Sequence, residues 1–351
     1  MTGLIRVLVV DDSAFVRKVV TQMLSRSPFI DVVGAAHDGA EALEMVERLR
    51  PDVVTLDLVM PVMDGLEFLR RQMAIRPLPV VVCSISHESG AAALEAFELG
   101  AVEFIQKPTA LATDRVFEIA DELVAKVKAA AAVHLARVPR SQEPPARDGA
   151  AAPKLASPAT ASQADIVVIG VSTGGPQALR EVIPRFPASF PVPIAVVLHM
   201  PLGYTEMYAQ RLNEISQLEV VEAKDGDHIR AGAMFLAPAG RHLTMRRNGD
   251  GTVRAHLDLR PADTPHRPAV DVLFRSAADV FGPRVLGVVM TGMGNDGVVG
   301  AAHVKANGGR IVTEAESSCI VYGMPRAVVE ACVSDRVATL AEMARTITEM
   351  V

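Results

Sequence analysis

The 351-residue chain has little cysteine, no excess of basic residues and no long apolar segment. Its three cysteines, Cys83, Cys319 and Cys332, are odd in number and widely separated, which argues against a disulfide framework or a zinc-ligand spacing. The net charge of −6 gives no excess of positive charge that would attract nucleic acid or an anionic membrane. No run approaches the roughly 18 apolar residues of a membrane span, and the acidic pair Asp11 and Asp12 comes too early for a signal peptide. A protein of the reducing cytoplasm is predicted.

A change of composition divides the chain. Residues 129–163 carry several prolines among alanine, serine, arginine and glutamine, with few large apolar side chains to offset the entropy of ordering. Short apolar strands alternate with amphipathic helices on both sides, which is typical of α/β domains with a mostly parallel sheet. We therefore predict one domain at 1–128, a linker at 129–163 and a second domain at 164–351.

A hydroxyl follows the first strand of the second domain. The segment 165–169 is apolar and β-branched, as in a buried parallel strand, and Pro176 suits the first turn of a helix. Ser172 lies between them, near the free amide groups of a helix N-terminus. A serine in such a turn is either a nucleophile or part of a phosphate-binding or helix-capping loop.

Two further strands end in residues that complete a catalytic set. His199 follows the apolar run 193–198, and Asp296 follows the run 285–290 within a glycine-rich loop. The carboxyl ends of parallel strands share one edge of a sheet, so Ser172, His199 and Asp296 are expected to converge as nucleophile, base and orienting acid. The chain order Ser, His, Asp differs from that of α/β-hydrolases, in which the acid precedes the histidine.

The same loop offers an alternative. Residues 292–297 form a Gly-x-Gly-x-x-Gly pattern between a strand and a helix, and Glu314 or Glu316 follows at nearly the distance of a dinucleotide fingerprint. The carboxylate of Asp296 would face a pyrophosphate there, which is electrostatically unfavourable. A nicotinamide enzyme thus remains the weaker hypothesis.

In the first domain, strands are predicted at 6–10, 31–35, 52–56, 79–83 and 102–105. Asp11 and Asp12 follow the first strand, Asp57 the third, Ser84 the fourth and Lys107 the fifth. Three carboxylates at one sheet edge repel each other unless a cation binds, and Mg²⁺ suits carboxylates, waters and a phosphoryl oxygen. Lys107 adds a point charge for the same anion.

Residues 4–128 resemble the receiver domain of two-component response regulators. The motifs are Val-Val-Asp-Asp-Ser at 9–13, Leu-Asp-Leu-Val-Met-Pro-Val-Met-Asp-Gly at 56–65, Ser84 and Lys107 followed by proline. The resemblance implies a flavodoxin-like (βα)₅ fold, phosphorylation of Asp57 by a histidine kinase, and Mg²⁺ held by Asp11, Asp12, Asp57 and the carbonyl of Val59. It also implies that Ser84 and Phe104 change conformation when Asp57 is phosphorylated, with Ser86 as the alternative to Ser84. The peptide bond before Pro108 is implied to be cis.

Residues 164–351 resemble the catalytic domain of the chemotaxis protein-glutamate methylesterases. The matching stretches are 170–176, 198–201, 237–242, 266–276, 291–297 and 321–326, with departures at Ala239 and at Ala331-Cys332, where the family often has glycine at the second position. The resemblance implies a doubly wound, mostly parallel Rossmann-like fold. In the implied reaction, Ser172 attacks a glutamate γ-methyl ester of a chemoreceptor, His199 transfers the proton to leaving methanol, and the Met293 amide binds the oxyanion.

Deamidation of receptor glutamine passes through the same intermediate and is implied as a second activity. No cofactor is expected for the ester reaction, and the expected partners are chemoreceptors and a histidine kinase, with no nucleic acid and no insertion into membrane. Arg241, His242 and Arg267 bind substrate or brace loops. A tethered receiver docked over the catalytic edge is predicted to inhibit until Asp57 is phosphorylated. A noncatalytic phosphate sink is the remaining alternative, against which the intact triad argues.

Overall fold

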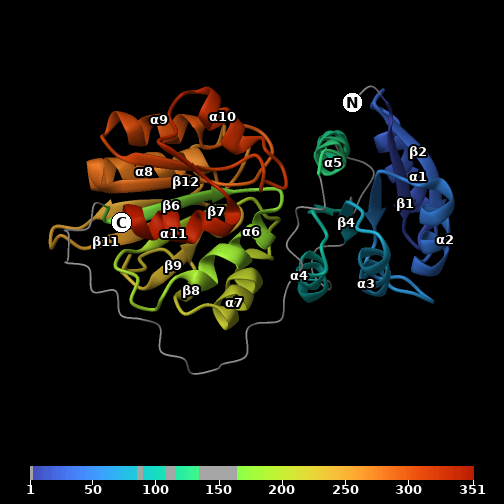
Figure 1. The fold of residues 1–351 in the computed structure, drawn as a ribbon, viewed down its shortest axis with the longest axis horizontal. Helices are drawn as coiled ribbons and strands as arrows, with labels where there is room; N and C mark the ends of the chain where they lie inside the picture. The colour runs from blue at the N-terminus through green and yellow to red at the C-terminus, as the bar shows by residue number, and fades with distance from the viewer. Residues whose placement is uncertain (1–2, 85–89, 108–114, 134–163) are drawn as a thin grey trace.

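The computed structural model describes residues 3–84, 90–107, 115–133 and 164–351, which form two α/β domains (Figure 1). The N-terminal domain contains a five-stranded parallel sheet with the order β2-β1-β3-β4-β5. Its three central strands are rich in valine and largely buried, as expected for a sheet covered on both faces. Their bounds are β1 (Ile5–Val10), β2 (Ile30–Ala36), β3 (Val53–Leu56), β4 (Val80–Ser84) and β5 (Glu103–Gln106).

Five helices cover this sheet. α2, α3 and α4 pack on one face and α1 and α5 on the other, each face with its own apolar cluster. Three of them begin at a residue whose side chain accepts a backbone amide, namely Ser13, Asp38 and Asp64. The helices are α1 (Ala14–Leu24), α2 (Gly39–Leu49), α3 (Gly65–Ile75), α4 (Gly90–Glu98) and α5 (Arg115–Ala131). α5 continues beyond the domain boundary predicted at residue 128, because Ala130 is buried against the domain core.

The C-terminal domain contains a seven-stranded parallel sheet with the order β14-β13-β12-β6-β7-β9-β8. An antiparallel hairpin, β10 with β11, packs beside it. The strands are β6 (Ile166–Val171), β7 (Ile194–Leu198), β8 (Glu219–Glu222), β9 (Ala233–Leu236), β10 (His242–Arg247), β11 (Val253–Asp258), β12 (Val285–Val289), β13 (Arg310–Glu314) and β14 (Arg336–Ala338). The predicted class, two α/β domains with parallel sheets, is confirmed.

Helices cover both faces of this second sheet. α6, α7 and α11 share one apolar cluster with it, and α8, α9, α10 and the hairpin share the other. The helices are α6 (Gly175–Val182), α7 (Thr205–Ile215), α8 (Val270–Phe281), α9 (Val298–Ala306), α10 (Met324–Glu330) and α11 (Leu340–Met350), with short 3₁₀ turns at Ile183–Arg185 and Gly282–Arg284. The chain runs from β6 to β7 on one side and from β12 to β13 on the other, so the sheet has a switch point between β6 and β12.

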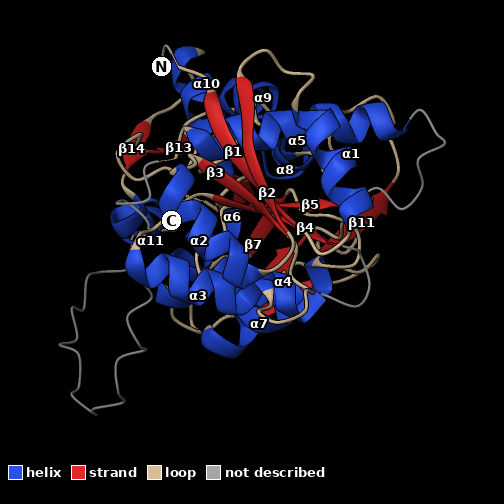
Figure 2. Ribbon diagram, turned by 90° about the vertical axis from the view of Figure 1, so that its right-hand side faces the viewer, coloured by secondary structure: helices blue, strands red, loops and turns tan. Residues whose placement is uncertain are grey.

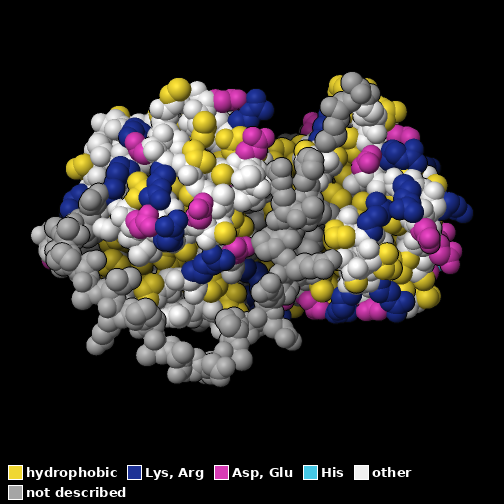
Figure 3. Space-filling view, viewed as in Figure 1, with side chains coloured by type: hydrophobic (Ala, Val, Ile, Leu, Met, Phe, Trp, Pro, Cys, Tyr) yellow, Lys and Arg dark blue, Asp and Glu magenta, His cyan; other side chains and the backbone are white. Residues whose placement is uncertain are grey.

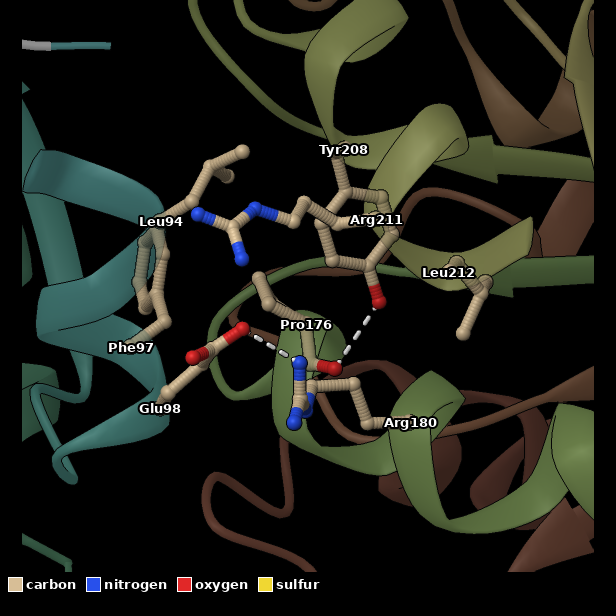
Figure 4. Close-up of a pocket in the computed structure, with 8 residues that line it drawn as sticks. All are labelled: Leu94, Phe97, Glu98, Pro176, Arg180, Tyr208, Arg211 and Leu212. Carbon is tan, nitrogen blue, oxygen red and sulfur yellow. Dashed lines mark hydrogen bonds and ion pairs between the residues drawn. The ribbon is translucent and has the colours of Figure 1, made fainter. Parts of the chain in front are cut away.

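The two domains contact each other through α4 and β5 of the first and α6 and α7 of the second (Figures 1 and 2). Figure 4 shows the side chains at the α4 side of this contact, where Glu98 pairs with Arg180 at 2.5 Å and Phe97 lies near Arg211. Deeper in the contact, the ring of Phe104 packs on Tyr204 with centroids 4.9 Å apart. Apolar packing and an ion pair thus join the domains.

Candidate functional site

The predicted nucleophile and base follow two paired strands. Val171 and Leu198, the last residues of β6 and β7, are register partners, so Ser172 and His199 begin adjacent loops at one sheet edge. On the other side of β6, the Ser172 amide donates to the carbonyl of Thr291 at 3.0 Å, which ties the serine turn to the loop after β12. The site therefore lies at the switch point of the sheet, where ligands bind in open α/β folds.

Glycine permits the close packing of the serine turn. A Cβ on Gly170 would lie 2.3 Å from the side chain of Val270 on α8, so no other residue fits there without displacement. Gly174 has φ +78° and precedes α6. Within the described residues the Ser172 hydroxyl makes no hydrogen bond, whereas the neighbouring Thr173 is buried and donates to Glu103 of the N-terminal domain at 2.6 Å.

His199 and Asp296 form a hydrogen-bonded pair. Nε2 of His199 lies 2.9 Å from Oδ2 of Asp296, and the same carboxylate accepts the amides of Val270 and Asp271 at 2.8 and 2.9 Å. These amides belong to the first turn of α8, whose dipole also favours a negative charge. Burial by itself raises the pKa of Asp296, but the bonds from His199 and the two amides outweigh it and hold the pKa below its ordinary value.

This pairing determines which imidazole nitrogen can act as a base. Because Nε2 donates to the ionised Asp296, the neutral ring presents the lone pair of Nδ1, and Nδ1 is buried with no hydrogen-bond partner in the described structure. The ring of His266 stacks on that of His199 with centroids 4.1 Å apart. His266 as a whole is exposed, but desolvation of its ring, with a smaller contribution from His199 when that ring is protonated, lowers the pKa of His266 to about 4, so His266 is neutral near pH 7.

The loop at 291–297 lies against the serine turn. A Cβ on Gly292 would lie 2.9 Å from the Cβ of Ser172, so glycine allows this contact. Met293 follows, with 38% of its surface exposed, and its amide makes no hydrogen bond to any residue that the structure describes. An amide without a partner beside the serine turn suits the predicted oxyanion donor, whose role stays a prediction.

His242 braces a loop. Its side chain is fully buried, with Nδ1 accepting the amide of Ala269 at 3.2 Å and Nε2 facing the carbonyl of Pro261 at 3.1 Å. It thereby supports both ends of the segment that carries His266. Arg267 also belongs to this loop and donates to the carbonyl of Ala262 at 3.1 Å, whereas Arg241 is exposed.

The geometry disfavours the nicotinamide hypothesis. Glu314, one of the two acids proposed for a ribose hydroxyl, is fully buried and accepts the amide of Thr291 at 2.8 Å. The amides of Gly297 and Gly300, at the start of the helix that would receive a pyrophosphate, already donate to the carboxylate of Asp271. Neither Glu314 nor the N-terminus of α9 is therefore available for a dinucleotide in the manner of the fingerprint.

The N-terminal domain brings its predicted acids together. One carboxylate oxygen from each of Asp11, Asp12 and Asp57 lies within 4.8 Å of the others, with Asp11 and Asp57 buried and Asp12 exposed. Nζ of Lys107 is 2.6 Å from Oδ2 of both Asp11 and Asp57. Burial raises the pKa of Asp57, against the opposing effect of Lys107. Several hard oxygen donors in one place fit the requirements of Mg²⁺.

The other predicted receiver residues lie either near this cluster or at the contact between the domains. Ser84 ends β4 and is buried, and Val59 is exposed, with its amide 3.4 Å from Oδ1 of Asp57. Phe104 lies on β5 at the domain contact. Ser86 and Pro108 lie outside the described residues, as does nearly all of the predicted linker.

Several residues that support the site were not singled out from the sequence. Thr173 and Glu103 join the serine turn to the other domain, and Asp271 accepts the amides of Gly297 and Gly300 at 2.9 and 2.6 Å. The acid at Asp271 was visible in a matching motif, but its partners are distant in sequence. The bond between Thr173 and Glu103 had no sequence signal, because it crosses the domains.

The surface and the helices add two observations. On the face shown in Figure 3, basic and acidic side chains are interspersed, without a field of one sign. In the described part of the chain, no helix has the length and apolarity needed to cross a membrane.

Comparison with known proteins identifies both domains. Residues 7–116 match the response regulator receiver domain and residues 167–347 match CheB methylesterase. A Myxococcus xanthus protein named protein-glutamate methylesterase/protein-glutamine glutaminase 5 is 52% identical over 93% of this chain and 92% of its own length. A Symbiobacterium thermophilum protein of the same type is 45% identical over 99% of this chain and 97% of its own.

A solved structure agrees with the sequence matches. The CheB methylesterase catalytic domain of Thermotoga maritima is 40% identical and aligns with a TM-score of 0.52, covering 54% of this chain and 99% of that domain. The resemblance predicted from the sequence motifs is confirmed. The chain belongs to the protein-glutamate methylesterase/protein-glutamine glutaminase family, with a response regulator receiver domain preceding a CheB methylesterase domain.

Proposed function

We propose that this chain hydrolyses glutamate γ-methyl esters on chemoreceptors, releasing methanol, and deamidates receptor glutamines at the same site. The observation that carries the proposal is the His199–Asp296 pair, held by α8 at the sheet edge where the Ser172 turn begins. Membership of the methylesterase family supports the substrate class. The expected setting is adaptation in chemotaxis or a related chemosensory pathway in the cytoplasm.

In the proposed reaction, Oγ of Ser172 bonds to the ester carbonyl carbon while Nδ1 of His199 takes the hydroxyl proton. The carbonyl oxygen becomes an oxyanion, for which the Met293 amide, unpaired among the described residues, would be a donor. Collapse breaks the bond to the methoxy oxygen, which receives the proton from His199 and leaves as methanol. Water then attacks the acyl-enzyme in the same way, restoring Ser172 and producing glutamate. With glutamine as substrate, the leaving group is ammonia.

Asp296 serves this cycle by remaining ionised. Its lowered pKa keeps it a carboxylate near neutral pH, so it holds His199 with Nε2 protonated and Nδ1 free to accept. It also offsets the positive charge that His199 gains after taking the proton from Ser172. His266 limits rotation of the imidazole through ring stacking and, being neutral, adds no competing charge.

The receiver domain supplies regulation. Asp57 would accept a phosphoryl group from a histidine kinase, with Mg²⁺ held by Asp11, Asp12, Asp57 and the Val59 carbonyl. When bound, the cation offsets the charge of the phosphoryl oxygens. Lys107, which pairs with Asp57 in this structure, would turn to the new phosphoryl group together with Ser84.

The domain contact supports inhibition by the unphosphorylated receiver. Glu103 binds the residue next to Ser172, and Phe104, at a predicted switch position, packs on Tyr204. On the other side of the contact, Ile320 and Val321 of the catalytic domain pack against the apolar cluster that contains α5. A bulky receptor helix would compete with the receiver for this edge, so displacement on phosphorylation would open it.

Methanol release from methylated receptor membranes tests the function directly. Wild type is expected to release methanol faster after treatment with a small phosphodonor, whereas folded Ser172→Ala is expected to release none. The fragment 164–351, which corresponds to a domain solved by itself in Thermotoga maritima, should be faster than the unphosphorylated chain and insensitive to the phosphodonor. Wild-type rates in Ser172→Ala would refute the nucleophile, and a fragment no faster than the full chain would refute masking.

A further inference from the structure

The inference concerns Glu314, a buried carboxyl at the end of β13 that takes no part in the proposed reaction. Its side chain is fully buried and belongs to none of the ion pairs formed by the described residues. Oε2 accepts the amide of Thr291 at 2.8 Å, and Oε1 accepts the hydroxyl of Ser318 at 3.0 Å. Burial of a carboxyl without a cation is costly, so its presence requires a reason.

Thr291 connects Glu314 to the nucleophile. Its carbonyl accepts the amide of Ser172 at 3.0 Å, and its hydroxyl donates to the carbonyl of Thr173 at 2.9 Å. The hydroxyl also accepts the amide of Val321 at 2.9 Å, so Thr291 contacts both the serine turn and the loop that precedes α10. The position of the Thr291 backbone therefore sets the position of the Ser172 backbone.

Thr291 also begins the loop that leads to the predicted oxyanion donor. The carbonyl of the next residue, Gly292, accepts the amides of Gly323 and Met324 at 3.1 and 2.8 Å, and its Cα packs on Ser172. Met293 and then Asp296 follow within the same loop. A shift at Thr291 would thus displace the nucleophile and the oxyanion donor relative to each other.

We propose that Glu314 is a positioning residue of the esterase site, fixing Thr291 and through it both the Ser172 turn and the Met293 loop. Oε2 can accept the Thr291 amide in either protonation state of the carboxyl, and the ionised form holds it more strongly. Burial raises the pKa of Glu314 to about 7, opposed by its bonds from Thr291 and Ser318. This inference rests on the proposed function, because it assigns Glu314 a role around the same nucleophile.

The test compares side chains of similar length in the full chain. Glu314→Gln keeps an oxygen for the Thr291 amide and offers an NH₂ group to Ser318, so kcat should stay within about threefold of wild type. Glu314→Met removes both acceptors and should lower kcat by roughly 10- to 100-fold, because small displacements at a reacting centre are expensive. KM should change little in either variant, since Glu314 is buried away from the substrate surface.

A second readout separates this inference from the proposed function. The rate at which a fluorophosphonate probe labels Ser172 reports nucleophile and oxyanion geometry without a receptor, and it should fall in Glu314→Met in parallel with kcat. Ser318→Ala is the control, because it removes the bond from Ser318 to the carboxylate, together with the bond that Ser318 accepts from the Leu340 amide, and spares Thr291. It should lower the melting temperature while labelling stays at the wild-type rate.

The contrary result is a folded Glu314→Met variant that has a lower melting temperature but the kcat and labelling rate of wild type. That result would show that Glu314 has only a structural role, and it would overturn the proposal. Loss of labelling in Ser318→Ala equal to that in Glu314→Met would overturn it as well. If the methionine variant does not fold, Glu314→Ala is measured in its place, with the same expected loss. A wild type that is labelled but releases no methanol would refute the proposed substrate, while the labelling rates still decide Glu314.

Discussion

The hydrogen bond between the domains gives the sharpest prediction about regulation. Glu103 is 9% exposed, and its Oε2 accepts the Thr173 hydroxyl at 2.6 Å. Its other oxygen accepts the Phe104 amide at 2.9 Å and lies 3.4 Å from Nζ of Lys126, both within the receiver. Glu103→Ala therefore removes one bond that exists only while the receiver is docked. The substitution also removes the contacts to Phe104 and Lys126. These contacts are present in both the docked and the undocked receiver, so their loss does not change the equilibrium between the two states.

The expected size follows from this single bond. A buried hydrogen bond to a charged group contributes about 1.5–3 kcal/mol, which corresponds to a change of roughly 10- to 150-fold in the equilibrium between docked and undocked receiver. The unphosphorylated Glu103→Ala chain should therefore release methanol faster than unphosphorylated wild type, up to the rate of fragment 164–351. Phosphodonor should then add little.

Conservative variants and a double-mutant cycle provide the controls. Glu103→Gln retains an oxygen for Thr173 and should raise the basal rate less than Glu103→Ala does. Thr173→Val removes the donor instead, and its effect should not add to that of Glu103→Ala if the two side chains act through one bond. Basal rates at the wild-type level in Glu103→Ala, together with a faster fragment, would show that other contacts hold the receiver in place.

Three further predictions concern the two sites. Asp57→Asn should take no label from a small phosphodonor, as should wild type in excess chelator; a labelled variant would contradict the assignment of the acceptor. Asp296→Asn should lower kcat for methanol release by on the order of 10⁴-fold, less than Ser172→Ala does, and a near-normal kcat would exclude Asp296 as the orienting acid. Because the folded-state pKa of His266 is about 4, below the ordinary 6.5 or so of histidine, the unfolded chain binds more protons between these values. The stability that His266 contributes is complete above the higher value and is lost as the pH falls toward the lower one. His266→Phe keeps the stacked ring but cannot be protonated. When the pH is lowered from about 7 to about 5, its melting temperature should therefore fall less than that of wild type, and equal falls would contradict the lowered pKa of His266.

The sequence predicted the fold because its strands carry a strong local signal. Buried valine-rich runs located the parallel strands, and the rule that their carboxyl ends share an edge predicted that His199 would meet Asp296 across 97 positions. Strand ends were less accurate, since backbone pairing determines them. β5 runs from Glu103 to Gln106 rather than over 102–105, because Gln106 pairs with Ser84.

What the sequence could not predict depends on packing between distant segments. The first amides of α8 fix the position of the Asp296 carboxylate, and that position determines which nitrogen of His199 it contacts. The antiparallel hairpin was not predicted, because β10 and β11 are polar on one side and carry no long apolar run. The alanines at the end of α5 have the composition of a linker, yet Ala130 is buried by tertiary contacts.

Thr173 has a consequence for how such a protein can evolve. Its side chain makes the bond to the receiver, whereas its carbonyl, which every amino acid possesses, accepts the hydroxyl of Thr291. A single codon change at position 173 can therefore alter the coupling between the domains and leave the backbone bond beside the nucleophile intact. Selection can tune the sensitivity of the enzyme to its signal at this position without rebuilding the catalytic centre.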